Sequence, residues 1–282
     1  MSLPKFLNLS SIPDSLKKPV EDFVFRIENI KPGSVQGFYI LGSIAFNDFY
    51  FNNSDVDFLF LFKDMPDKQT IAEYEKIHQA IRQAYKVPDF NGFYIDFGCL
   101  INIQTSIEAK VTHFYRGEML LNSPLYLPKY NLFDLATIGL SVYGTNAKSL
   151  PIKITVDEVI DEIYKSTQTY WYKWINKYSK PLRGLLAIGF FPALAEYSIT
   201  TMSRNIYLIN EKKITSKSDA VKCCLNKLPD EYHSILSEVL NFRKSNRSKK
   251  TIRFSFTRRK KTMKCLIYMM SEFDKHYKLL RE

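Results

Sequence analysis

Two carboxylates, spaced one residue apart at Asp55 and Asp57, stand at the start of an unbroken apolar run, Phe58-Leu59-Phe60-Leu61-Phe62. A run of this length and composition is typical of a strand that is buried on both faces of a sheet. Side chains alternate between the two faces of a strand, so we expect Asp55 and Asp57 to point the same way. Two like charges on one face require a cation, or one of them must be protonated. The segment therefore predicts a sheet that presents paired carboxylates, and oxygen ligands of this kind suit Mg²⁺.

The segments on either side of this strand add further groups. Residues 38–41 predict a strand that leads into Gly42-Ser43, where a glycine lets the backbone turn tightly and approach a phosphate. Ser43 and the nearby backbone amides could donate to that phosphate at the start of the following helix. Downstream, the apolar run 94–101 predicts another strand that carries one carboxylate, Asp96. Three carboxylates on adjacent strands could hold two Mg²⁺ ions, bind a triphosphate and activate an attacking hydroxyl.

A structural interpretation of the same three acids is the alternative. Asp55 would then be a turn or cap residue, Asp57 a strand-end charge and Asp96 an acid on an edge strand. For an Asp-x-Asp pair alone, this interpretation is the more common one. The upstream Gly-Ser turn and the third acid on a strand favour the metal site.

Hydrophobic periodicity predicts a mixed α/β sheet followed by helices. Within residues 16–30, apolar residues recur at helical spacing and predict a helix. An amphipathic helix predicted at 71–84 separates the two acid-bearing strands. Between 105 and 150 the pattern is mixed, and Arg116 and Glu118 could reach the site or lie on a surface helix. Gly144 and Pro151 bracket the expected domain boundary. Beyond it, the sequence predicts helices at 156–174, 185–209, 217–228, 232–242 and 262–280.

The composition excludes several classes of protein. With 282 residues, 45% hydrophobic and 15% aromatic, the chain can bury one or two cores and is not expected to be disordered. No apolar stretch reaches the roughly 18 residues that span a bilayer, and no signal-peptide pattern is present. The four cysteines and four histidines show no metal-ligand spacing, and the adjacent Cys223 and Cys224 make a poor disulfide framework. We therefore expect a cytoplasmic protein with reduced thiols and no membrane contact.

The net charge of +11 is unevenly distributed. Residues 1–150 hold 14 Lys and Arg against 16 Asp and Glu, whereas residues 151–282 hold 26 against 13. This split fits a Mg²⁺-binding half followed by a phosphate-binding half, and it also fits a helical domain that binds nucleic acid. The segment 243–261 alone contains ten basic residues and no acid. It could be a solvated loop or could contact a phosphate-rich partner.

The Gly42-Ser43 turn, Asp55-x-Asp57 and the later Asp96 resemble the signature of the nucleotidyltransferase (polymerase beta-like) superfamily. Further along, the chain resembles one branch, the aminoglycoside adenylyltransferases that modify streptomycin and spectinomycin. The segments that carry this resemblance are Met202-Ser203-Arg204-Asn205-Ile206-Tyr207, Lys213-Ile214-Thr215-Ser216-Lys217, Leu228-Pro229 and a shorter echo at Leu140-Ser141-Val142-Tyr143-Gly144. The resemblance extends from about residue 35 to about residue 240.

The resemblance implies an α+β fold with two domains. Residues 1–150 would be the nucleotidyltransferase domain, a mixed sheet with flanking helices, and residues 151–282 an all-helical domain that closes the nucleotide and acceptor cleft. Two Mg²⁺ ions and ATP as co-substrate are expected. Asp55 and Asp57 would coordinate both ions, and Asp96 would complete the second and act as the base. The groups expected to bind ATP are Gly42, Ser43, Arg204 and Lys217, because the branch contacts the phosphates through the corresponding Arg and Lys.

This chain departs from the branch in two respects. Asp96 stands where the streptomycin and spectinomycin enzymes carry a glutamate as base, so its side chain is one methylene shorter. Between Trp171 and Arg204 the chain is longer than those enzymes, and counterparts of their drug-contacting residues are not recognisable there. A helical region with an excess of 13 positive charges also disfavours a polycationic drug.

The expected activity is transfer of AMP from ATP to a hydroxyl of a small, aminocyclitol-like molecule, with release of pyrophosphate. The first alternative is a nucleotidyltransferase that modifies RNA or a protein, which the basic segment 243–261 favours. The second is a nucleotide-binding regulator of the same fold that lacks catalysis. The third is an interaction protein in which the acids are incidental.

Overall fold

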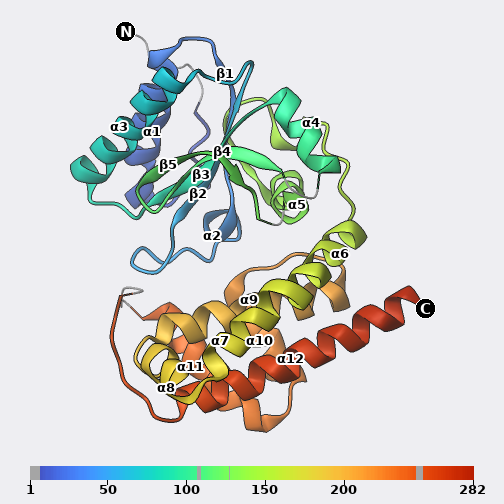
Figure 1. Ribbon diagram of the computed structural model, residues 1–282. Helices are drawn as coiled ribbons and strands as arrows, with labels where there is room; N and C mark the ends of the chain where they lie inside the picture. Colours follow the sequence, from blue (N-terminus) through green and yellow to red (C-terminus); the bar gives the residue numbers. More distant parts are fainter. Residues whose placement is uncertain (1–6, 107–108, 127, 246–249) are drawn as a thin grey trace. The chain divides into compact units, whose positions relative to one another are not determined.

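The computed structural model describes residues 7–106, 109–126, 128–245 and 250–282 (Figure 1). The chain forms two compact units, Met1–Ile154 and Thr155–Glu282. The first unit is built on a six-stranded mixed sheet, and the second is helical in the residues that the structure describes. The predicted fold class, an α+β chain with a mixed sheet followed by an all-helical region, is confirmed.

The sheet of the first unit has the strand order β5-β4-β3-β2-β1-β6. Strands β2 and β3 run parallel, and each of the other neighbouring pairs in the described sheet is antiparallel. The six strands are β1 (Val35–Ile40), β2 (Val56–Phe62), β3 (Phe90–Asp96), β4 (Lys110–Tyr115), β5 (Glu118–Pro124) and β6 (Leu140–Gly144).

Helices cover both faces of this sheet (Figure 1). Phe58 and Phe60 of β2 pack into the core beneath α1 and α3, whereas Leu59 and Leu61 pack into the core beneath α4 and α5. This alternation follows from the two-residue period of a strand, and each fully buried side chain contributes about 1.5–3 kcal/mol. The helices of this unit are α1 (Asp14–Ile30), α2 (Gly42–Ala45), α3 (Lys68–Tyr85), α4 (Phe97–Thr105), α5 (Pro128–Ile138) and the 3-10 turn η1 (Ala147–Ser149).

One polar pair lies within the α1 and α3 core. His78 of α3 is hydrogen-bonded to the Tyr94 hydroxyl of β3 at 2.6 Å, and its ring stacks on Phe114. Burial lowers the pKa of His78 to about 3, because the charged imidazolium would lose its hydration. This histidine is therefore neutral at pH 7 and holds α3 against the middle of β3.

The second unit is a set of helices around α9, which packs against α10, α11 and α12. A capping box formed by Thr155 and Glu158 begins α6. The elements are α6 (Val156–Ser166), η2 (Thr167–Trp171), α7 (Tyr172–Ser179), α8 (Pro181–Gly184), η3 (Leu185–Gly189), α9 (Pro192–Glu211), α10 (Lys217–Lys227), η4 (Asp230–Tyr232), α11 (His233–Lys244) and α12 (Arg258–Arg281).

The single helix predicted at 185–209 is wrong in its first turns. The π-helical turn η3 ends at Gly189, and α9 begins at Pro192, with a bend of 93° between Pro181–Gly189 and Pro192–Glu211. Proline favours the first turn of a helix because it has no N–H to donate. Among the described helices, none is by itself long and apolar enough to cross a membrane, although this bent pair passes that test jointly.

Candidate active site

Asp57 and Gly42 are in direct contact where β1 ends and β2 begins. A Cβ atom added to Gly42 would lie 2.2 Å from Oδ2 of Asp57, so a side chain at this position would collide with the carboxylate. Gly42 also has a φ of +60°, a conformation that favours glycine. The Leu41 N–H donates to the Asp57 carbonyl at 2.9 Å, which fixes the turn against the strand. The structure thus brings together the Gly-Ser turn and the acid of β2.

Ser43 and Asp55 lie beside this contact in the chain. Ser43 is in the first turn of α2, and its hydroxyl oxygen is buried with no hydrogen-bond partner among the described residues. An unsatisfied buried hydroxyl costs about 1–3 kcal/mol, so it is a group that a ligand could satisfy. Asp55 immediately precedes β2 and, like Asp57, is half-buried.

The parallel register of β2 and β3 decides which residues accompany Asp57. Asp57 lies opposite Asn91, whereas Asp96 lies opposite Phe62, at the other end of the two strands. Five residues of strand separate the two positions, which corresponds to roughly 16 Å. Asn91 therefore occupies the neighbouring position on the face of Asp57, and Asp96 does not.

Asp96 has a structural role at the far end of the sheet. It is the N-cap of α4, and its Oδ1 accepts a hydrogen bond from the Cys99 N–H at 2.6 Å. Asp96 does not lie beside Asp57 as predicted, because the parallel pairing of β2 and β3 places it at the opposite end of the two strands. The strand predicted to continue to Ile101 also ends at Asp96. In the described part of the chain, no three His, Cys, Asp or Glu side chains are arranged to hold a metal. Burial, together with the nearby charge of Asp96, raises the pKa of the Cys99 thiol to about 11.

The turn between β4 and β5 reaches Asn91. The Arg116 N–H donates to Asn91 Oδ1 at 3.1 Å, and Arg116 and Gly117 have φ values of 53° and 91°. The surface helix considered for this segment is therefore wrong, because the segment is a hairpin turn. The sequence does not single out Asn91, because an amide at the start of a strand carries no metal-site signal by itself. Its pairing with Asp57 follows from the start of β3 at Phe90 and from the parallel direction of β2 and β3.

Asp89 is the carboxylate closest to Asn91 in the chain. Its backbone carbonyl accepts from the Val56 N–H at 2.9 Å, which places it beside Asp55 at the start of the strands. Its side chain forms an ion pair with Arg82 of α3 at 3.2 Å. This carboxylate is therefore engaged by a helix of the scaffold.

Arg204 and Lys217, the predicted phosphate ligands, are both in the helical unit. Arg204 lies half-buried in α9, and Lys217 is the first residue of α10. The Ser216 side chain caps α10 by accepting from the Asp219 N–H at 3.0 Å, so the predicted first-turn position of Lys217 is confirmed. Helices α9 and α10 pack against each other. The contact of these two cations with ATP stays a prediction.

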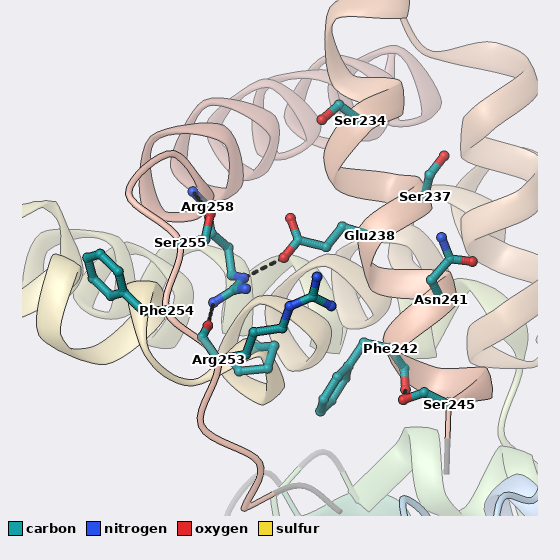
Figure 2. Close-up of a pocket in the computed structure, with 11 residues that line it drawn as sticks. Ser234, Ser237, Glu238, Asn241, Phe242, Ser245, Arg253, Phe254, Ser255 and Arg258 are labelled. Atoms are coloured by element: carbon teal, nitrogen blue, oxygen red, sulfur yellow. Dashed lines mark hydrogen bonds and ion pairs between the residues drawn. The ribbon is translucent and has the colours of Figure 1, made fainter. Parts of the chain in front are cut away.

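The basic segment 243–261 is largely built into the helical unit. Arg258 is buried, forms an ion pair with Glu238 of α11 at 2.6 Å and donates to the carbonyl oxygen of Arg253 (Figure 2). It also donates to the carbonyl oxygen of Gly189. These bonds cross one side of a cavity of about 700 Å³ that α11 and residues 253–258 line. Arg258 therefore ties the segment to α11 and η3.

Two more arginines of the segment make internal contacts. Arg243 is buried and donates to Glu196 of α9 at 2.5 Å, and Arg259 donates to the carbonyl oxygens of Tyr178 and Ser179. Residues 246–249 of the predicted basic segment lie outside the described residues. For the three arginines, neither a solvated loop nor an open phosphate-binding surface describes the arrangement.

Comparisons with known proteins agree with this architecture. Residues 192–265 match the family described as "Aminoglycoside adenylyltransferase, C-terminal domain", a span that includes Arg204 and Lys217. The chain resembles the crystal structure of spectinomycin adenyltransferase AAD(9) from Enterococcus faecialis with ATP and spectinomycin, with a TM-score of 0.68 and 16% identity over 91% of this chain and 98% of that chain. The resemblance to the aminoglycoside adenylyltransferase branch is confirmed, and the structural match shows a shared fold.

Two other comparisons add little. A toxin-antitoxin structure with AMP-PNP matches at 15% identity, covering 55% of this chain and 94% of that chain, but its TM-score of 0.26 is too low to carry an argument. No curated protein sequence matches the chain.

Proposed function

We propose that this protein is a cytoplasmic nucleotidyltransferase that moves AMP from ATP to a small acceptor and releases pyrophosphate. The observation that carries the proposal is the contact between Asp57 and Gly42, followed by the unsatisfied Ser43 hydroxyl, in a fold shared with an adenyltransferase. Only glycine fits at position 42 beside the Asp57 carboxylate. A turn without a side chain at this place suits the close approach of a metal-bound phosphate.

Each group has a role in this proposal. Ser43 and the amides of the Gly42 turn would donate to phosphate oxygens, and Arg204 and Lys217 would neutralise phosphate charge. Asp55 and Asp57 would hold Mg²⁺ together with the nucleotide, since two carboxylates plus phosphates and water are a common Mg²⁺ ligand set. The ion would supply charge neutralisation at the transferred phosphoryl group. Asp96, predicted to complete a second ion and act as base, lies at the opposite end of β2 and β3 and has no role in this proposal.

The resemblance also suggests a class of acceptor. By resemblance it would be a hydroxyl of an aminocyclitol, since the adenyltransferase that shares the fold was solved with ATP and spectinomycin. A hydroxyl loses its proton during the transfer, and this requires a base near Asp57. Asn91, which occupies the neighbouring position, cannot act as that base.

Transfer to RNA has less support than the sequence alone suggested. That alternative depended on the basic segment 243–261, and three of its arginines are bonded within the helical unit. A regulator without catalysis stays a separate alternative, which a measurement of turnover distinguishes.

The test is Mg²⁺-dependent release of pyrophosphate from ATP by the purified protein, measured with streptomycin, spectinomycin, kanamycin, lincomycin and short RNAs, and with the smaller acceptors named below. We expect release with at least one small acceptor and its loss in Asp57→Asn. Binding of Mg·ATP without release for any acceptor would contradict the proposed enzyme and favour the regulator.

A further inference from the structure

We propose that the acceptor attacks ATP through an oxygen that is already negatively charged, as in a phosphate monoester, and that Asn91 selects it by donating a hydrogen bond. This inference rests on the proposed nucleotidyl transfer and names the acceptor class for that same site.

The orientation of the Asn91 amide is the first observation. Its Oδ1 accepts from the Arg116 N–H at 3.1 Å, so the acceptor end of the amide is held toward the hairpin turn of β4 and β5. The other end of the amide is an NH₂ group with two donors. The position beside Asp57 therefore offers donors to a ligand, whereas a carboxylate there would offer acceptors and could take a proton.

The acids on β2 and β3, and on the residues that lead into these two strands, do not replace this missing base. Asp96 caps α4 at the opposite end of the strands. Asp89 is at the correct end, but its carboxylate forms an ion pair with Arg82. Asp55 and Asp57 are committed to the metal in the proposed function, and a carboxylate that binds Mg²⁺ is a poor proton acceptor. Strands β2 and β3 and their leading residues thus supply metal ligands and a donor beside them.

The overall charge favours the same class of acceptor. The chain carries +11, and residues 151–282 hold twice as many Lys and Arg as Asp and Glu. Such a charge raises the local concentration of anions and lowers that of polycations such as aminoglycosides. The interior positions of Arg243 and Arg258 reduce this effect but leave the exposed lysines Lys244, Lys250 and Lys260.

An anionic acceptor makes the reaction balance without a base. One oxygen of the acceptor phosphate forms a bond to the α-phosphorus of ATP, and the bond from that phosphorus to the α–β bridging oxygen breaks. The electron pair leaves with pyrophosphate, and the product is an adenylate joined through a new diphosphate linkage. No proton needs to be removed from the acceptor, because a phosphate monoester has a second pKa of about 6 and is largely dianionic at neutral pH.

Matched acceptors test this inference on the unmodified protein. We would measure transfer of label from α-³²P-ATP to glycerol 3-phosphate, ribose 5-phosphate and glucose 1-phosphate, each against glycerol, ribose or glucose, with spectinomycin as a further hydroxyl acceptor. We expect at least one phosphate monoester to exceed its parent alcohol by about 100-fold or more in kcat/KM, on the scale of a general-base contribution. Its rate should rise through the pKa of the acceptor near pH 6 and then stay level.

Two variants separate the role of Asn91 from a structural one. Asn91→Asp should lower kcat/KM for the phosphate acceptor by about 10-fold through like-charge repulsion and should raise transfer to the hydroxyl acceptors by a similar factor. Asn102→Asp, on the exposed surface of α4, is the control for an added charge and should change neither. Equal Tm values for the two variants would show that the difference is not a loss of folding.

Three outcomes would overturn the inference. The first is preferred transfer to a hydroxyl acceptor by the unmodified protein, and the second is an unchanged preference in Asn91→Asp. The third is loss of transfer to hydroxyls in Asp89→Asn, which would identify Asp89 as the base. Each of these leaves nucleotidyl transfer standing, whereas absence of Asp57-dependent transfer to every acceptor would remove the proposed function itself.

Discussion

At the amino end of the parallel strands β2 and β3, Asp57 stands beside Asn91, whereas at the carboxyl end Asp96 stands beside Phe62. At the first end, Asp57 lies against Gly42, which has a positive φ, and the next residue in the chain, Ser43, has an unsatisfied buried hydroxyl. The polar residue at the second end closes a hydrogen bond to the helix that follows it. At the first end a buried hydroxyl is available to a ligand, whereas at the second end the Asp96 carboxylate already accepts a hydrogen bond from α4.

The comparison shows that residue type alone does not identify a site. Both ends carry an aspartate on an apolar strand, and both aspartates are half-buried. What separates them is the direction of the strands, because parallel pairing brings like ends together. An acid near the start of one strand and an acid at the end of its parallel neighbour cannot share a metal ion.

The largest expected effect is the difference in activity between a substitution at the amino end and one at the carboxyl end of the strands. Asp57→Asn should lower the rate of pyrophosphate release by about 10²-fold to 10⁴-fold, because the carboxylate would hold the Mg²⁺ that neutralises the phosphate charge. Asp96→Asn should change that rate by less than about threefold, since an asparagine still caps a helix. Steady-state kinetics of the two variants measures this, and equal losses would contradict the assignment of Asp96 to structure.

The sequence could predict the helices and strands and most residues at the amino end of β2, because the sequence signals for them are local. The unbroken apolar run of β2 and the helix start at residue 217 depend on signals within a few residues, and both are found where expected. The third member of the site could not be predicted in this way. It depends on where β3 begins, on its direction and on its pairing with β2, which are long-range properties of the sheet.

The misassignment of Asp96 has a particular cause. Residues 97–101, Phe-Gly-Cys-Leu-Ile, are as apolar as the strand before them, so hydrophobic content alone extends the strand through them. In the structure they begin α4, and Asp96 supplies its cap. An aspartate between two apolar runs is thus compatible with a helix start as well as with a buried ligand, and here it starts a helix.

The next effect tests how closely the amino end is packed. Gly42→Ala should destabilise the first unit by about 2–3 kcal/mol and also reduce activity, because the new Cβ combines a positive φ with a collision with Asp57. Gly33→Ala is the matched control, since Gly33 has a φ of +80° with nothing within 4 Å of an added Cβ. It should cost about 1 kcal/mol through backbone strain alone and leave activity unchanged. Urea unfolding and turnover of both variants would decide, and equal losses would mean that the contact with Asp57 is unimportant.

A smaller effect concerns the core that joins the two ends. The pKa of His78 is about 3 in the folded protein, against 6.5 as its ordinary value, so below pH 6.5 the unfolded chain binds a proton that the folded chain does not. The free energy of unfolding should therefore fall as the pH falls from 6.5 toward 3, by about 2 kcal/mol at pH 5. His78→Gln, which can still bond the Tyr94 hydroxyl, should remove this part of the acid sensitivity. Urea unfolding of both proteins at pH 7 and pH 5 measures it, and parallel losses in the two would refute the role of His78.

The smallest effect sharpens the comparison at the carboxyl end. Asp96→Ala removes the oxygen that accepts from the Cys99 N–H and should destabilise the first unit by about 1 kcal/mol, the usual cost of losing an N-cap. Asp96→Asn keeps an acceptor at the same place and should recover most of that loss, whereas a metal ligand would not be rescued by an amide. Chemical unfolding of the two variants, with turnover measured in parallel, distinguishes the roles. A loss of activity in both, with stability unchanged, would show that Asp96 serves the reaction despite its distance from Asp57, and the division between the two ends of the strands would then fail.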